Sequence, residues 1–177
     1  MLKNDRSELD YSRLVKQDRR RVAGRGSPLR IALLADVSTQ HLVPVLRALL
    51  ANNGVDAEIY EAGYDTIELE SVNQASGLYA FEPKIVIILQ SLQKLRAAYY
   101  DFPGERATFC SDRAARSEAV WRSILEKSGA QIVQSNFVLP YERPYGNYGT
   151  KVEETLGGVV AELNRELRLR SRAIPGV

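Results

Sequence analysis

The sequence predicts an α/β protein, a three-layer sandwich around a parallel sheet of four or five strands. Short, wholly apolar runs such as residues 31–35 and 85–89 are typical of strands buried on both faces. These runs alternate with segments of helical periodicity, which is the pattern of βαβ units. The 177 residues fit one domain, and an apolar fraction of 45% excludes disorder of the whole chain.

The first 28 residues are polar and charged, and we interpret them as a short leader helix followed by a linker. Residues 29–177 are predicted to form the α/β domain. Its first strand covers residues 29–35. The next helix begins near residues 39–42, and it ends at Asn53-Gly54 because glycine favours the C-cap conformation.

The middle of the domain continues the alternation. We predict a second strand at residues 55–60, then short helical turns, and a third strand at residues 85–89. A helical region follows and is broken at Pro103-Gly104. Its second part covers residues 112–127, and a fourth strand begins at Gln131.

The last part of the domain combines a long loop with a helix. Residues 136–148 are rich in proline and glycine and predict the loop. Thr150 and Glu153 have the spacing of a capping box, which predicts that a helix begins there. Residues 173–177 resemble the entrance to a fifth strand that is cut off. The expected strand order is 2-1-3-4, with any fifth strand beside the fourth.

Composition narrows the classes of function. A net charge of +2 does not favour nucleic acid as a partner. One cysteine and one histidine exclude a disulfide framework and a metal site built on several such ligands. No apolar run approaches the roughly 20 residues of a membrane span, and no secretory signal is visible. We therefore expect a cytoplasmic protein with no membrane partner and no cofactor.

The topology predicts where a ligand binds. In open parallel sheets, ligands bind beyond the carboxyl ends of the strands, at the switch between the first and third strands. Arg143, held between two prolines, suits a carboxylate or a phosphate. The predicted substrate-binding residues are Asp36, Ser38, Gln90, Ser91, Asn136, Arg143 and Asn147.

Ser38 is also a candidate catalytic nucleophile, because it follows a strand where a helix begins. A serine nucleophile needs a base, and the chain has one histidine, His41, three residues further on. Some serine esterases take this base from an Asp-x-x-His motif late in the sequence, and that motif is absent here. The alternative interpretation is that Ser38 or Thr39 caps the helix.

Several segments together resemble the N-terminal domain of FkbH-like proteins. Their order and spacing carry this resemblance over most of the chain. The segments are Ile31–Thr39, Leu42–Leu50 with Asn53-Gly54, Tyr60, Tyr64-Asp65, residues 76–83, Val86–Leu89, Asn136-Phe137, Pro140, Arg143-Pro144, Gly146-Asn147 and Leu163-Asn164-Arg165.

The resemblance implies an SGNH-hydrolase-like domain that lacks the full hydrolase motifs. In the family this domain precedes a phosphatase-like domain of the haloacid dehalogenase superfamily. The family is implied to dephosphorylate bisphosphoglycerate and to load the glyceryl group onto an acyl carrier protein in polyketide biosynthesis. That second domain carries an Asp-x-Asp nucleophile and is the place where Mg²⁺ is expected. This sequence has no Asp-x-Asp pair, so we expect neither of them in this chain.

The resemblance thus favours a domain that positions a substrate or a carrier protein. Its implied partners are an acyl carrier protein and the downstream haloacid dehalogenase-type domain. Carrier proteins are acidic, and a basic stripe on the last helix could receive one; its residues are Arg165, Arg168 and Arg172. Two alternatives stay open: a divergent esterase or acyltransferase that uses Ser38, and a non-catalytic interaction module.

Overall fold

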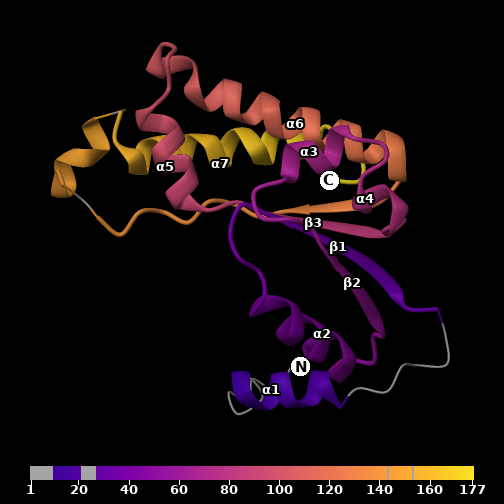
Figure 1. Cartoon of the computed structure of the whole chain (residues 1–177). Coiled ribbons are helices and arrows are strands. Elements are labelled where there is room, and N and C mark those ends of the chain that lie inside the picture. The colour runs from indigo at the N-terminus through magenta and orange to yellow at the C-terminus, as the bar shows by residue number, and fades with distance from the viewer. Residues whose placement is uncertain (1–9, 21–26, 143, 153) are drawn as a thin grey trace.

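The computed structural model describes residues 10–20, 27–142, 144–152 and 154–177. Within these residues, the sheet has four parallel strands in the order β2-β1-β3-β4 (Figure 1). The strands are β1 (Leu29–Ala35), β2 (Ala57–Glu61), β3 (Ile85–Leu89) and β4 (Gln131–Gln134). The predicted α/β class and the order of the first four strands are confirmed.

The same residues form seven α-helices and two short 3₁₀ helices. Five helices lie on one side of the sheet, and α1 and α2 lie on the other (Figure 1). The helices are α1 (Tyr11–Arg19), α2 (Leu42–Asn52), α3 (Ile67–Val72), α4 (Gly77–Ala80), α5 (Leu92–Tyr100), η2 (Arg106–Thr108), α6 (Phe109–Ser128), η3 (Gly146–Lys151) and α7 (Leu156–Arg172).

The main hydrophobic core lies between the sheet and helices α6 and α7. Alternate residues of β1 and β3 point into it, and Leu34, Val86 and Ile88 are at most 1% exposed. Trp121 of α6 and Leu163 of α7 pack from the helical side. The core fixes α6 above the carboxyl ends of the strands, where it forms one wall of the site described below.

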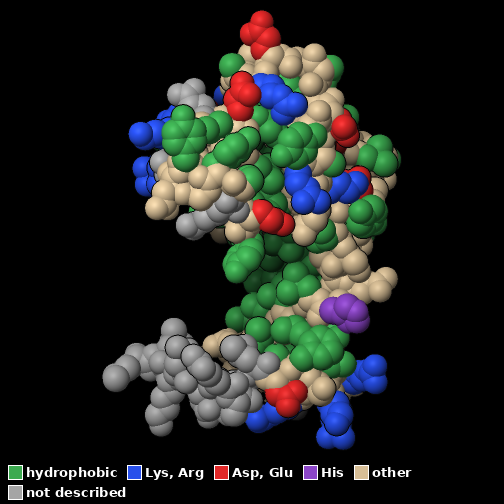
Figure 2. Space-filling view, turned by 90° about the vertical axis from the view of Figure 1, so that its left-hand side faces the viewer, with side chains coloured by type: hydrophobic (Ala, Val, Ile, Leu, Met, Phe, Trp, Pro, Cys, Tyr) green, Lys and Arg blue, Asp and Glu red, His purple; other side chains and the backbone are tan. Residues whose placement is uncertain are grey.

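The opposite face of the sheet is covered unevenly. Leu33 of β1 is buried, because α2 packs over the β1–β2 side of the sheet. Ile87 pairs with Leu33 and points to the same face, but it is only half-buried. Val133, next in the row, is 54% exposed. Figure 2 shows green hydrophobic side chains in the hollow between the upper helices and α1–α2.

Helix α1 packs on the outer side of α2. Asp10 caps α1 by accepting a hydrogen bond from the backbone N–H of Arg13. Leu14 is the residue that α1 buries, at 2% exposure. Asp18 forms an ion pair with Arg47 of α2 at 2.9 Å. A helix therefore forms inside the predicted leader segment and is held by α2, while residues 1–9 and 21–26 of that segment lie outside the described residues.

Asn164 of α7 fastens the segment that leaves β4. Its side-chain oxygen accepts a hydrogen bond from the backbone N–H of Phe137, and its amide donates to the carbonyl of the same residue, both at 2.8 Å. The side chain therefore acts as a short piece of strand beside Phe137, which is 5% exposed. This contact sets the direction in which the loop leaves the sheet.

The predicted start of the last helix is wrong. α7 begins at Leu156, and its N-cap is Thr155, whose hydroxyl accepts from the backbone N–H of Gly158. The capping box was expected at Thr150 and Glu153, but residue 150 belongs to η3, and Glu153 lies outside the described residues. The residues at which the α-helix was expected to begin belong instead to the end of the 3₁₀ helix η3.

Candidate functional site

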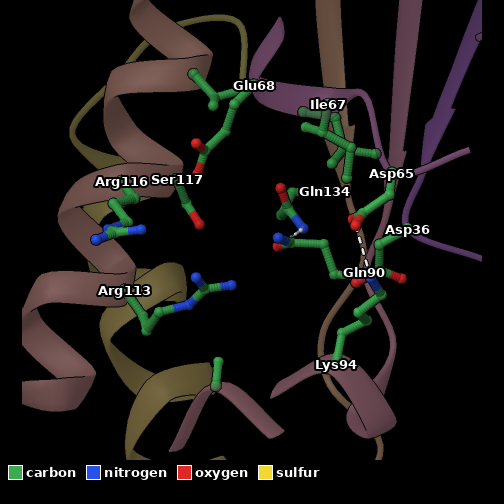
Figure 3. A pocket seen from close by; sticks show the side chains of 13 residues that line it. Asp36, Asp65, Ile67, Glu68, Gln90, Lys94, Arg113, Arg116, Ser117 and Gln134 are labelled. Atoms are coloured by element: carbon green, nitrogen blue, oxygen red, sulfur yellow. Dashed lines mark hydrogen bonds and ion pairs between the residues drawn. The ribbon is translucent and has the colours of Figure 1, made fainter. Parts of the chain in front are cut away.

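A polar cavity of about 310 Å³ lies at the carboxyl ends of β1, β3 and β4 (Figure 3). The order β2-β1-β3-β4 makes the point between β1 and β3 the switch of the sheet, where ligands of such folds bind. One wall consists of residues that follow the strands, and α6 forms the other wall. The cavity therefore lies beside the strand ends that the topology rule selects, and its second wall comes from an element that the sequence analysis did not expect there.

Asp36, directly after β1, joins two elements at the sheet wall. It is 6% exposed, and its two carboxylate oxygens accept from the backbone N–H of Ser91 at 2.8 and 3.0 Å. Ser91 is the N-cap of α5, and its hydroxyl accepts from the backbone N–H of Lys94 at 3.2 Å. The charge of Asp36 is thus used to hold the start of α5 at the end of β1.

Two glutamine side chains lie side by side in the lining of the cavity. Gln134 ends β4, and Gln90 follows β3. The amide nitrogen of Gln134 donates to the side-chain oxygen of Gln90 at 3.3 Å and to the carbonyl of Ser135 at 3.1 Å. The side-chain oxygen of Gln134 accepts from the indole N–H of Trp121 at 3.1 Å.

The α6 wall is cationic. Figure 3 shows the guanidinium of Arg113 reaching across the cavity toward the two glutamines. In the part of the chain that the structure describes, this group makes no hydrogen bond or ion pair. Burial lowers the pKa of Arg113, and the charge of Arg116 one turn away lowers it further. Arg116 and Ser117 line the same wall.

The mouth of the cavity carries an ion pair. Asp65 and Lys94 meet at 2.6 Å, and this hydrogen bond raises the pKa of Lys94. Lys94 also lies 5.3 Å from the ring centre of Tyr64. Glu68 of α3 adds another carboxylate to the lining. Among the described residues, no group of three or more metal-binding side chains could hold a metal ion.

The structure brings some of the predicted substrate-binding residues together. Asp36 and Gln90 line the cavity, and Ser91 binds Asp36. Three others are exposed and do not belong to the lining, namely Ser38, Asn136 and Asn147. Arg143 lies outside the described residues.

Ser38 and His41 are not arranged as a nucleophile and its base. The Nδ1 atom of His41 and the hydroxyl of Tyr11 are 2.9 Å apart and share a hydrogen bond. The hydroxyl of Ser38 makes no hydrogen bond to any of the residues that are described. The histidine is thus engaged by the leader helix.

The three arginines predicted to receive a partner are all exposed on α7. Arg165 is bound to two carboxylates of the same helix, Glu162 at 2.7 Å and Glu166 at 2.8 Å. These pairs reduce the net positive field around Arg165. Arg168 and Arg172 have no ion pair within the described ranges.

Sequence reasoning missed the cationic wall entirely. Arg113 and Ser117 fall on the same helical face as the core residues Val120 and Ile124. Polar residues that continue an apolar stripe are a signal for a polar pocket at the end of a core. Gln134 could have been found by the strand-end rule that selected Gln90.

Comparisons with known proteins agree with this architecture. The sequence model of the family described as "FkbH, N-terminal domain" matches residues 30–176. The fold is similar to a crystal structure of the N-terminal part of protein BF1531 from Bacteroides fragilis, described as containing a phosphatase domain and complexed with Mg. The identity is 24% and the TM-score 0.80.

That similarity covers 95% of this chain and 44% of the Bacteroides chain, so this chain spans less than half of its neighbour. No functionally curated protein matches the sequence. Among the described residues, no helix has both the length and the hydrophobicity needed to cross a membrane.

Proposed function

The chain belongs to the family of FkbH N-terminal domains, and from this premise we propose that it positions a substrate for a phosphatase-type partner domain. The observation that carries the proposal is the cavity at the switch of the sheet, into which the guanidinium of Arg113 points without a hydrogen bond or ion pair to any described residue. A half-buried cation without a partner is costly, and a ligand of opposite charge removes that cost.

The finer form of the proposal follows from what the family resemblance implies. The domain presents a glyceryl unit, or the acyl carrier protein that accepts it, to a haloacid dehalogenase-type phosphatase and glyceryltransferase. That partner domain holds the Asp-x-Asp nucleophile and Mg²⁺. The SGNH-like pocket then serves binding and not hydrolysis, in a cytoplasmic polyketide pathway.

A carrier protein would meet the chain on α7. Arg168 and Arg172 are exposed and unpaired within the described ranges, and they suit an acidic surface. Such an attraction raises the association rate and weakens with salt. Arg165 contributes less, because Glu162 and Glu166 already neutralise it.

The alternative of an esterase or acyltransferase that uses Ser38 has little support from the geometry. His41, the one histidine of the chain, binds Tyr11 instead of Ser38. The alternative of a pure interaction module requires that the cavity binds nothing.

The experiment is a titration of the ¹⁵N-labelled chain followed by amide chemical shifts. One arm adds the N-acetylcysteamine thioester of 3-phospho-D-glycerate, called the glyceryl thioester below, whose phosphate supplies the charge opposite to that of Arg113. The acetyl thioester is the matched ligand control. The other arm adds a holo acyl carrier protein to the wild type and to a variant with Arg165, Arg168 and Arg172 changed to Glu.

We expect saturable shifts around Gln90 and Arg113 with the glyceryl thioester and not with the acetyl thioester. We expect the carrier protein to shift α7 of the wild type only. If neither ligand gives saturable shifts, the positioning function is wrong. If the carrier protein alone binds, and equally well to both proteins, the α7 surface is not its docking site.

A further inference from the structure

We propose that Arg113 and Gln90 are the two sides of an oxyanion-binding site, in which a compact carboxylate or phosphate monoester accepts hydrogen bonds from both. The inference rests on the proposed function in taking this cavity as the substrate site. It adds the chemical class of the group that binds there. It also assigns a role to Gln134, which lines the cavity beside Gln90, and to Trp121, which binds Gln134 from the core.

The orientation of Gln134 is fixed from the core. The indole N–H of Trp121 can only donate a hydrogen bond, so the atom of Gln134 that faces it must be the oxygen. The amide nitrogen of Gln134 then points the other way. Its two hydrogens are used by the side-chain oxygen of Gln90 and the carbonyl of Ser135.

The orientation of Gln90 follows from that of Gln134. Because the oxygen of Gln90 accepts from Gln134, its amide nitrogen is the free end. Within the described residues no acceptor takes either hydrogen of this nitrogen. Gln90 lines the cavity, so two N–H donors are presented there. Gln134 and Trp121 are therefore positioning residues that act through Gln90.

Arg113 supplies donors from the opposite wall. A guanidinium carries five N–H donors and no acceptor, and it suits carboxylate and phosphate oxygens. In Figure 3 it lies across the cavity from Gln90. Gln90 and Arg113 thus offer donors that no described residue accepts, and Arg116 adds a second positive charge. An anion with at least two oxygens can accept hydrogen bonds from both walls at once.

The carboxylates around the cavity do not fill this role. Both oxygens of Asp36 accept from the backbone N–H of Ser91, and Asp65 is paired with Lys94. Glu68 is exposed and forms no ion pair with Arg113, but its negative charge and that of Asp36 raise the pKa of the guanidinium and offset part of the effect of burial. These acidic groups can instead accept hydrogen bonds from hydroxyls beside the bound anion.

The test uses the single tryptophan of the chain as a reporter, because Trp121 is two hydrogen bonds away from the site. Its fluorescence is followed while inorganic phosphate, acetate or D-glycerate is added at constant ionic strength, with chloride as the reference anion. The variants are Arg113→Gln, which removes the charge, and Gln90→Glu, which replaces a donor by an acceptor of the same shape. Arg96→Gln is the matched control, since Arg96 is exposed on α5 and does not line the cavity.

We expect a saturable change with phosphate, with the carboxylates, or with both, and the pattern identifies the oxyanion that the site prefers. Each site variant should weaken binding about tenfold or more, which corresponds to the loss of a hydrogen bond to a charged group. The control should bind as the wild type does. Circular dichroism establishes that the variants are folded.

Two outcomes overturn the oxyanion site. One is the absence of saturable binding to any of these anions, and the other is unchanged affinity in folded Arg113→Gln and Gln90→Glu. If the glyceryl thioester still binds in either case, the positioning function stands without the oxyanion site. If neither the anions nor the thioester and carrier protein bind, both proposals are wrong.

Discussion

Replacing Asn164 by alanine removes the link between α7 and the segment that leaves β4. In the wild type, one side chain satisfies both backbone groups of Phe137 through two hydrogen bonds of 2.8 Å. Phe137 is 5% exposed, so water cannot readily replace the amide. The substitution therefore leaves a donor and an acceptor unpaired in a buried place.

The magnitude follows from the number of groups affected. Each hydrogen bond contributes about 1 kcal/mol, and a buried group left unsatisfied costs about 1–3 kcal/mol. Two such groups predict a loss of about 2–6 kcal/mol in the free energy of unfolding. For a domain of this size the melting temperature should fall by roughly 4–24 °C.

The assay is equilibrium unfolding in urea, followed by circular dichroism. Asn164→Asp keeps the acceptor for the N–H of Phe137 and loses the donor, so it should fall between alanine and the wild type. Asn136→Ala is the control, since that exposed side chain should change stability by less than about 0.5 kcal/mol. A loss in Asn164→Ala no larger than in this control would show that the two bonds do not hold the loop.

Two further predictions concern side chains with reactive groups. Burial raises the pKa of the Cys110 thiol to about 11, and the thiol donates to the carbonyl of Val159, so iodoacetamide should label the folded chain at pH 8 much more slowly than the unfolded chain. Equal labelling rates in the folded and unfolded chain would contradict the protection of this thiol. Because its folded pKa lies above the unfolded value, the contribution of the thiol to stability is complete below about pH 8.5 and is lost as the pH rises toward 11. Ser38→Ala should hydrolyse p-nitrophenyl acetate at the wild-type rate, because His41 binds Tyr11; a clear loss of turnover would instead make Ser38 a nucleophile.

Much of the sheet could be predicted because β1 and β3 are short and apolar over most of their length. The apolar runs of β1 and β3 end where their hydrogen-bonded pairing ends, at Ala35 and Leu89. Asn53 and Gly54 mark the end of α2, and Gly54 has the positive φ of 77° that favours glycine. These signals depend on residues that are neighbours in the sequence, so they can be recognised without knowledge of the fold.

The start of α7 depended on a choice between two local signals. Thr150 and Thr155 are both acceptable N-caps, and the preceding turn of 3₁₀ helix decides between them. Rules based on the spacing of capping residues do not predict that turn. The error therefore lies in the length of the connection and not in the existence of the helix.

The site was predicted on one wall only. Asp36 and Gln90 follow strands, and the topology of parallel sheets brings strand ends together. Arg113 and Arg116 come from the first half of a 20-residue helix, far along the chain from any strand end. Only the packing of α6 on the sheet places them beside Gln90, so long-range contacts decide their role.

The uneven cover of the sheet has a consequence for how the isolated chain behaves in solution. Ile87 is half-buried and Val133 is 54% exposed, so part of the β3–β4 face meets water as an apolar surface. A net charge of +2 gives little repulsion to keep two such surfaces apart. Sulfate and phosphate salts screen that repulsion and strengthen apolar contact. Colloidal stability should therefore decrease as the concentration of such a salt increases, and a charged substitution at Val133 should restore it.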